Sequence, residues 1–521
     1  MNTRFQSAIA KLAATLVLGI LLTRCTATSM GAERPPAVNV ILWFDTEDYI
    51  LPADDDATKR LCDMLTERGI RATFKLVGEK ARVLERRGRQ DVIDALKRHD
   101  IGYHTDYHSV HPTPAEYLAD CGWVDGIEEF VRREAGGAAD VRRILGVPVL
   151  ACYGQPGSSW GPQAVAALPL IGVAPHGVPC YVDDDSHIGF DGKPFWYAGA
   201  LNVFRMNPNL ARMELHEPAA LEAASKRVAS IANRLSAEGG GLISIYYHPC
   251  EWVHTQFWDG VNFARGANPP REAWRPPPQR SKEETDSAFK RFGDYVDFIS
   301  SLPGVRWITA SDLPGLYPDR ARSSGATEAD LNALASQLVK EASTGLDFRR
   351  IGDRAFSVAE QFELLAIALD ASLDGRPVVF PLRPSVLFGP DTATAPHPTL
   401  TTLTMPAFRA ALRDARGFVE KEHRIPARVF VGSELVPPAD FLVAMAAVWT
   451  MPRSSGAPPK ETSVPLGKDT RILPERHLAK ETPELYGNWI IHKEGFRAPK
   501  LVDLARLQTW TLKPAILNPA P

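Results

Sequence analysis

The sequence has little net charge, few cysteines and, beyond its first residues, no long apolar run. Lysine and arginine total 59 against 62 aspartates and glutamates, so the formal net charge is −3 at pH 7. With no basic arm, the sequence gives no reason to expect a nucleic-acid partner. Past the N-terminus no stretch reaches the roughly 18 apolar residues that a membrane span requires, so we predict a mature chain without a transmembrane segment.

The cysteines show no Cys-x-x-Cys spacing, which argues against a zinc site built from cysteines. One or two disulfides are compatible with an oxidising compartment, although the sequence does not say which cysteines would pair. Burial as small apolar residues explains most of them equally well. The six are Cys25, Cys62, Cys121, Cys152, Cys180 and Cys250.

The N-terminus has the pattern of a secretory signal peptide. Basic residues precede an apolar run from Leu12 to Leu22, and small residues follow it. We therefore predict that residues 1–32 are removed and that the protein is exported to the periplasm or the extracellular space. Cys25 lies where a lipoprotein would carry its anchor, but Arg24 beside it argues against lipid attachment.

A chain of 521 residues is too long for one ordinary core, so we expect two or three domains. Between residues 33 and 322, strands predicted at Val38–Phe44 and Ile70–Gly78 alternate with helices predicted at Ala57–Arg68 and Val83–Arg98. This alternation predicts an α/β fold with a mainly parallel sheet. In such folds the active groups lie at the carboxyl ends of the strands.

Acidic side chains follow the first predicted strand, in Asp45-Thr46-Glu47-Asp48. If the strand continues, Asp45 and Glu47 share one face and Asp48 points away. Carboxylates at the end of a buried strand are costly unless they share a cation or a proton, so the cluster indicates a functional site. A helix N-cap or a solvated loop is the alternative explanation.

Two histidines, His104 and His108, are four residues apart. On one helical turn or in a tight loop both rings face the same way, and they can then bind one zinc ion at about 2.0–2.1 Å per Zn–N bond. Among 13 histidines such a pair also arises by chance. A third histidine, His248, ends a strand predicted at Leu242–Tyr247, where a general acid or base is expected.

A glycine- and proline-rich turn, Gly154–Pro162, follows a further strand predicted at Val147–Tyr153. Such a turn can expose backbone N–H groups as oxyanion donors, or it can be a plain loop. We predict that side chains in and just before this turn contact the substrate. We also predict that a later acidic cluster is a solvated turn. The substrate contacts are Tyr153, Gln155 and Trp160, and the acidic cluster is Asp183–Asp185.

From Val38 to Pro318 the chain resembles the NodB-homology polysaccharide deacetylases, a family of carbohydrate esterases. The stretch His104-Thr105-Asp106-Tyr107-His108 fits the His-Ser/Thr-x-x-His motif of the family, and Ala72-Thr73-Phe74 with Gly78 fits its second strand. The resemblance implies a distorted (β/α) barrel and a divalent metal, Zn²⁺ or a related ion. It also implies roles for single residues: Asp45 as general base, His248 as general acid, and His104 and His108 as metal ligands together with Glu47 or Asp48.

Two departures from the family pattern matter. The family commonly has adjacent aspartates in its first motif, whereas here the acids are spread, which leaves Glu47 and Asp48 as alternative ligands. The third motif usually carries an arginine before a proline. The matching Gly154-Gln155-Pro156 has none, so the sequence offers no obvious side chain to orient the base and leaves the substrate class open.

The second part of the chain contains an internal repeat. Residues Ile351–Phe362 resemble Val431–Phe441, which predicts a duplicated module within a mainly helical domain from 323 to 451. The second copy weakly resembles pseudomurein-binding repeats through Phe430-Val431-Gly432 and Ala439-Asp440-Phe441-Leu442, which implies attachment to cell wall. Residues 452–521 are predicted to be a linker followed by a helix at Leu501–Thr511 that docks elsewhere.

These features together predict a zinc-dependent hydrolase that removes N-acetyl groups from an extracellular or cell-wall polysaccharide. Asp45 would take a proton from water, a backbone N–H near Gly157 would help to hold the oxyanion, and His248 would protonate the departing amine. One alternative is an amidohydrolase acting on a small cyclic amide. Another is a non-catalytic wall-binding protein on a deacetylase scaffold.

Overall fold

The computed structural model describes residues 37–452 and 462–518. The predicted signal peptide, including Cys25, lies outside these residues. Within the described ranges, no helix is both long enough and apolar enough to cross a membrane.

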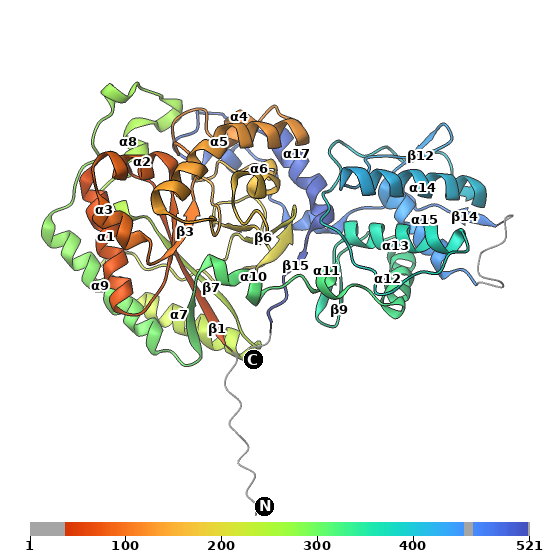
Figure 1. The fold of residues 1–521 in the computed structure, drawn as a ribbon, viewed down its shortest axis with the longest axis horizontal. Helices are drawn as coiled ribbons and strands as arrows, with labels where there is room; N and C mark the ends of the chain where they lie inside the picture. Colours follow the sequence, from red (N-terminus) through yellow and green to blue (C-terminus); the bar gives the residue numbers. More distant parts are fainter. Residues whose placement is uncertain (1–36, 453–461, 519–521) are drawn as a thin grey trace, which may run out of the picture. The chain divides into compact units, whose positions relative to one another are not determined.

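A parallel sheet forms the centre of the first part (Figure 1). Its strand order is β3-β2-β1-β7, and β8 pairs with the first half of β1. Every residue of β1 is buried, as expected for a strand that is covered on both faces. The strands are β1 (Val38–Thr46), β2 (Thr73–Leu76), β3 (Asp100–Tyr103), β7 (Gly241–Tyr247) and β8 (Val305–Ile308).

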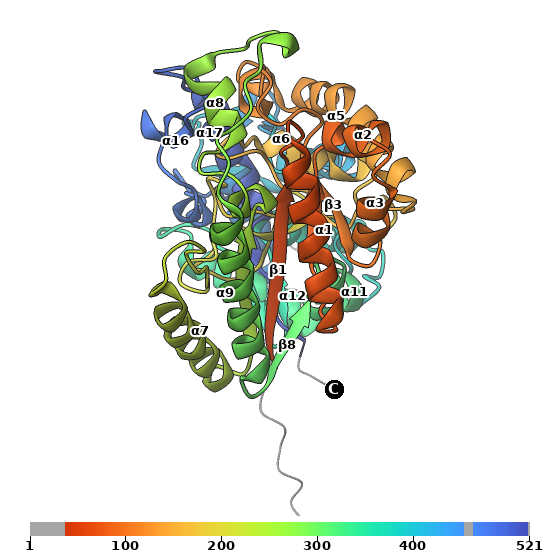
Figure 2. The same cartoon turned by 90° about the vertical axis from the view of Figure 1, so that its left-hand side faces the viewer.

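Helices connect these strands, and Figure 2 shows α1 and α9 running alongside β1. The sequence predicted one helix from Val83 to Arg98, but two are observed, because Gly88 takes a left-handed φ of +64° between them. The helices are α1 (Pro52–Glu67), α2 (Gly78–Arg86), α3 (Gln90–Leu96), α4 (Pro114–Leu118), α5 (Trp123–Leu145), α6 (Pro162–Ala167), α7 (Ala220–Ala237), α8 (Trp258–Asn262), α9 (Lys282–Ser301), α10 (Leu313–Leu316) and α11 (Arg320–Ser324).

Beyond β3 the sheet becomes irregular. Tyr153 forms isolated parallel bridges to Tyr103 on one side and Tyr181 on the other, where the sequence predicted a full strand. Near Ile171 the chain forms a short 3-10 turn with one bridge at Val173. Four short strands follow, in the order β15-β5-β6-β4: β4 (Cys180–Val182), β5 (Phe195–Tyr197), β6 (Ala200–Val203) and β15 (Lys513–Pro514). The predicted mixed α/β fold with a parallel central sheet is confirmed.

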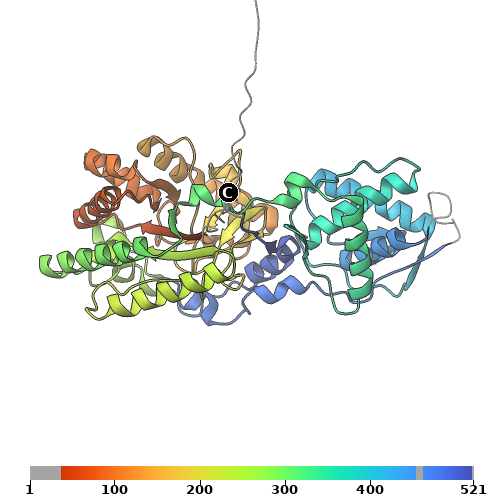
Figure 3. The same cartoon turned by 90° about the horizontal axis from the view of Figure 1, so that it is seen from below.

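The second part is mainly helical and carries the repeat as two similar units (Figure 3, teal to blue). In each unit a short antiparallel hairpin leads into an apolar helix. The first unit is β9 (Arg349–Ile351), β10 (Arg354–Phe356) and α13 (Val358–Leu373), and the second is β12 (Val429–Val431), β13 (Glu434–Val436) and α15 (Pro438–Thr450). The other elements are α12 (Glu328–Glu341), α14 (Met405–Glu422), β11 (Thr402–Thr404) and β14 (Ser463–Pro465).

The chain then returns to the first part. Helices α16 (Glu484–Gly487) and α17 (Pro499–Gln508) add Tyr486, Leu501 and Leu504 to the first hydrophobic core, and β15 extends its sheet. A second core begins near Ala321, close to the predicted boundary at 322. The five cysteines of the described residues are free thiols, and four of them are buried, in line with packing as small apolar residues.

Candidate metal centre

The carboxyl ends of three parallel strands of the central sheet, β1, β3 and β7, bring the candidate residues together. Asp45 is the penultimate residue of β1, and Glu47 follows that strand directly. His104 comes immediately after β3, and His248 immediately after β7. Because these strands run in the same direction, their ends meet at one edge of the sheet.

Glu47 contacts both histidines of the predicted pair. Its Oε2 atom lies 2.8 Å from Nε2 of His108 and 3.5 Å from Nε2 of His104. One ligand atom from each of the three residues fits within 4.8 Å of the other two, and all three side chains are buried. Burial alone would raise the pKa of Glu47, but His108 and His248 lower it well below its usual value, so the carboxylate is ionised.

The backbone between the two histidines forms a tight loop. Thr105 and His108 both take left-handed φ values, +63° and +58°, so this stretch is not a helical turn. The Thr105 hydroxyl donates to the carbonyl of His104 and accepts from the backbone N–H of His108 at 3.2 Å. The loop thereby turns both rings toward Glu47.

Contacts on the far side of each ring fix its orientation. Nδ1 of His104 donates to the carbonyl of Gly154 at 2.9 Å, which leaves the Nε2 lone pair facing Glu47. Nδ1 of His108 lies 2.6 Å from the Ser109 hydroxyl, which itself donates to Asp259 at 3.3 Å. Partners of this kind hold imidazole ligands in the correct tautomer.

These residues fit a divalent cation. Two neutral imidazole nitrogens and one carboxylate are a donor set typical of catalytic zinc, which keeps at least one position open. Nε2 of His108 is buried, and its near neighbour is the Glu47 carboxylate, so a cation placed between the two would be bound by both. The donor set leaves the choice among divalent ions open.

Asp48, the alternative ligand, points to the other face, as strand alternation predicts. Its Oδ2 lies 3.0 Å from Nδ1 of the buried His254, and its Oδ1 accepts from the backbone N–H of Ile50 at 2.8 Å. The structure therefore favours Glu47 as the metal ligand, whereas Asp48 pairs with His254.

Asp45, the predicted base, is held by a cation that sequence reasoning missed. Nζ of Lys75 lies 2.8 Å from Asp45 Oδ1, and Lys75 is fully buried. Burial alone would raise the pKa of Asp45, but His104, Lys75 and His248 lower it. The sequence offered no obvious side chain to orient the base, and in the structure Lys75 is in a position to do so.

Lys75 is fixed on its other side by the acidic cluster. Its Nζ donates to the carbonyl of Val182 at 2.9 Å and lies 3.3 Å from Asp183 Oδ2. The face of the Trp43 ring lies 4.0 Å from the same nitrogen. Asp183 is buried in this contact, and burial raises its pKa to about 8, so the expectation that the cluster is a solvated turn is wrong for this residue.

His248 faces Asp45 from the third strand. Its Nε2 lies 3.7 Å from Asp45 Oδ2, and its Nδ1 lies 2.7 Å from Glu251, which forms an ion pair with Arg212. Burial alone would lower the pKa of His248, but the carboxylates of Glu47, Glu251 and Asp45 raise it to about 9. The ring is therefore a protonated imidazolium near neutral pH.

These groups open into one cavity of about 720 Å³. Gln155 lines it, as predicted, and donates to Asp183 at 2.9 Å. Tyr153 and Trp160 are fully buried in the core and do not line this cavity, which contradicts the substrate contacts predicted for them. The lining also includes Phe257, Asp259, Tyr246, Trp489 and Ile490.

Comparison with known proteins gives matches among solved structures alone. No family model matches the sequence, and no curated protein matches it. The matching solved structures are polysaccharide deacetylases and carbohydrate esterases.

A predicted polysaccharide deacetylase from Mycobacterium smegmatis is 15% identical and gives a TM-score of 0.33, with 53% of this chain and 88% of that one covered. A family 4 acetyl xylan esterase from Clostridium thermocellum, solved with a cobalt ion, is 14% identical, with a TM-score of 0.25 and coverage of 53% and 90%. A family 4 carbohydrate esterase from Streptomyces lividans, solved with acetate, is 14% identical, with a TM-score of 0.27 and coverage of 52% and 91%. At these identities and TM-scores, the solved structures say nothing about the roles of the residues in this site.

Lys75 and Trp489 are two of the site residues for which the deacetylase motifs gave no signal. Lys75 had a local signal, since a lysine inside a buried strand needs an acidic partner, and the register of β1 on β2 places it opposite Asp45. Trp489 had none, because it reaches the cavity from a segment that follows the whole helical part.

Proposed function

We propose that this protein is a metal-dependent hydrolase that removes N-acetyl groups from an extracellular or cell-wall polysaccharide. The observation that supports the proposal most directly is the convergence of Glu47, His104 and His108 beside Asp45 and His248 in one cavity. This set offers three side chains that could hold a metal ion, a carboxylate that could act as base and an imidazolium that could act as acid. Those are the groups that hydrolysis of an amide bond requires.

Bound by the triad, a divalent cation supplies Lewis-acid activation of water and of a carbonyl oxygen. Lys75 holds Oδ1 of Asp45, so Oδ2 remains free to accept the proton of the attacking water. The imidazolium of His248, 3.7 Å from that oxygen, donates its Nε2 proton to the amide nitrogen as the C–N bond breaks. One water is consumed, and acetate and a free amine leave.

The assignment has a direct test in acetate release from N-acetylated oligosaccharides. The purified protein should release acetate, and chelation followed by dialysis should abolish the release, with recovery on adding Zn²⁺. His104→Ala should lose metal and activity together. His248→Ala should keep its metal but lose about 10²–10⁴ in kcat, the usual contribution of a general acid.

A matched control is His176→Ala, because His176 is exposed and lies outside the cavity. It should leave both the metal content and the rate unchanged. Acetate release that survives chelation, or an active His104→Ala protein, would sink the proposal. Ring opening of a cyclic amide without acetate release would favour the small-amide alternative, and wall binding without any turnover would favour the non-catalytic one.

A further inference from the structure

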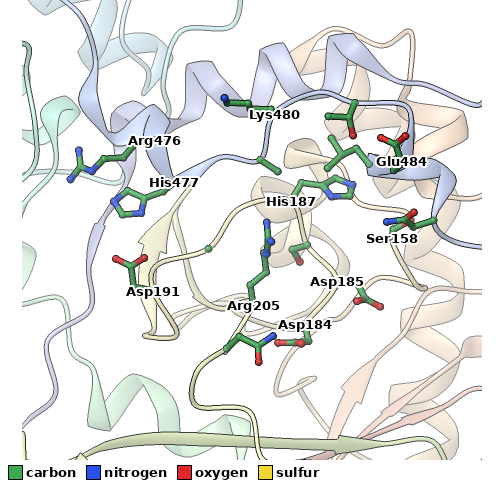
Figure 4. Close-up of a pocket in the computed structure, with 17 residues that line it drawn as sticks. Ser158, Asp184, Asp185, His187, Asp191, Arg205, Arg476, His477, Lys480 and Glu484 are labelled. Atoms are coloured by element: carbon green, nitrogen blue, oxygen red, sulfur yellow. The ribbon is translucent and has the colours of Figure 1, made fainter.

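A second, more polar hollow adjoins the metal cavity. It has a volume of about 760 Å³, and its wall includes Asp184 and Asp185, which also line the metal cavity. The two hollows therefore share a wall and lie next to each other. We call the second one the polar groove (Figure 4).

The two sides of the polar groove come from distant parts of the sequence. One side is formed by Ser158, the stretch from Asp184 to Asp191, and Arg205 of the α/β part. The other is formed by the C-terminal tail between Arg476 and Asn488. The next two residues of the tail, Trp489 and Ile490, line the metal cavity, so one continuous segment borders both hollows.

Two exposed cations, Arg205 and Lys480, lie on opposite sides of the polar groove. In Figure 4 the Arg205 side chain projects into the space between Asp191, His187 and Asp185. Within the described residues Arg205 has neither an ion pair nor a hydrogen bond, and its backbone takes a left-handed φ of +46°. Lys480 on the tail side is likewise without an ion pair among the described residues.

The second sign of a ligand site is His187. The residue is 4% exposed and packs against Trp160 and Tyr486; its ring bonds to the Ser158 backbone, yet Nε2 has no hydrogen-bond partner in the described chain. A buried imidazole nitrogen that makes no hydrogen bond loses its solvation without compensation. Because His187 lines the polar groove, a ligand hydroxyl there can supply the missing partner.

The chemistry of the wall points to a neutral carbohydrate. Carboxylates and cations both line it, and this mixture disfavours a polyanion. Sugar hydroxyls both donate and accept, so they can satisfy carboxylates and guanidinium groups at once. The charged residues are Asp184, Asp185, Asp191 and Glu484 on one hand, and Arg205, Arg476 and Lys480 on the other.

We propose that the polar groove binds the sugar units next to the one being deacetylated, with Arg205 and the C-terminal tail as the specificity-determining contacts. The inference rests on the proposed function, because it assumes that the reacting sugar occupies the metal cavity. It adds where the neighbouring units of that polysaccharide bind and which residues recognise them. It also assigns the tail a direct role in substrate binding.

The test is the dependence of rate on chain length, with N-acetylglucosamine oligomers of two and six units as probes. For the wild type, kcat/KM should be at least tenfold higher on the hexamer than on the dimer. Arg205→Asn should lower kcat/KM on the hexamer about tenfold, mainly through KM, and leave the dimer within twofold. Asparagine tolerates the left-handed backbone at this position.

Lys480→Ala provides a second variant, on the tail side, with the same expected pattern. The control is Arg383→Ala, since Arg383 is exposed and lies outside both hollows, and it should change neither rate. Binding of the hexamer to metal-free protein, measured by calorimetry, gives a readout that does not depend on turnover. There Arg205→Asn should weaken binding about tenfold.

The outcomes separate the two proposals. If neither oligomer releases acetate, the proposed function fails, and the calorimetry still decides the groove. If acetate is released at rates that do not depend on length, or if Arg205→Asn slows the dimer and the hexamer equally, the groove inference is overturned while deacetylation stands. Failure of the hexamer to bind the metal-free protein also overturns the groove inference.

Discussion

Replacing Lys75 by methionine should separate catalysis from metal binding. Lys75 lies between two carboxylates, 2.8 Å from Asp45 and 3.3 Å from Asp183, and is fully buried. Methionine keeps much of the side-chain volume and removes the charge. Asp45 then loses a cation that lowers its pKa, and it becomes a poorer base at neutral pH.

The expected size of the effect follows from the geometry. At 2.8 Å, and with an effective dielectric constant of about 20, the Coulomb attraction between Lys75 and Asp45 is roughly 6 kcal/mol, part of which offsets desolvation. Breaking one partner of a buried pair typically costs about 3–5 kcal/mol. Because His104 and His248 also face Asp45, we expect about 3 kcal/mol of lost stability and a kcat about 10²–10³ lower.

The measurements are urea unfolding, metal content and the initial rate of acetate release. Lys75→Met should keep its metal, since the triad does not include Lys75. The matched control is Lys59→Met, which breaks a partly exposed pair with Asp63 on α1 and should cost less than about 1 kcal/mol with no loss of rate. A Lys75→Met protein with wild-type kcat would refute the claim that this lysine supports the base.

Three further predictions concern other contacts. A Cβ on Gly157 would lie 2.5 Å from the Trp489 ring, so Gly157→Ala should displace that ring and raise KM several-fold more than it lowers kcat, as steady-state kinetics would show. His254→Ala leaves the buried Asp48 carboxylate without its partner and should cost about 3 kcal/mol in urea unfolding without changing metal content; loss of metal would show that Asp48 is a ligand after all. Burial lowers the pKa of His99 to about 4 from an unfolded value near 6.5. The contribution of the neutral ring to the free energy of unfolding is therefore complete above pH 6.5 and is lost as the pH falls toward 4. The wild type should then lose up to about 3 kcal/mol more than His99→Gln over that range, and parallel curves in pH-dependent unfolding would contradict the assignment.

The sequence predicted the part of the site that depends on local pattern. Strand alternation predicted that Glu47 and Asp48 point to opposite faces. The spacing of His104 and His108 predicted that both rings face one metal ion. Position at the end of an apolar strand identified His248. Each of these inferences uses residues close together in the chain, whose relative placement is set by the geometry of one strand or one loop.

The rest depends on register and long-range packing. Lys75 pairs with Asp45 only because β1 and β2 align residue for residue, which neither strand reveals alone. Tyr153 and Trp160 flank a turn that reaches the cavity, but their rings face the core, and the sequence does not fix that direction. Trp489 becomes visible as a site residue only when the tail has been followed back to the first part.

The returning tail also affects how the protein can be divided. Tyr486, Leu501 and Leu504 belong to the first core although they follow the whole helical part in the chain. A fragment cut near residue 322 would therefore expose a bare apolar surface and would lack one border of its own cavity. During synthesis this cavity is complete only after Trp489 and Ile490 have left the ribosome, so a chain that stops before them should have an unfinished cavity.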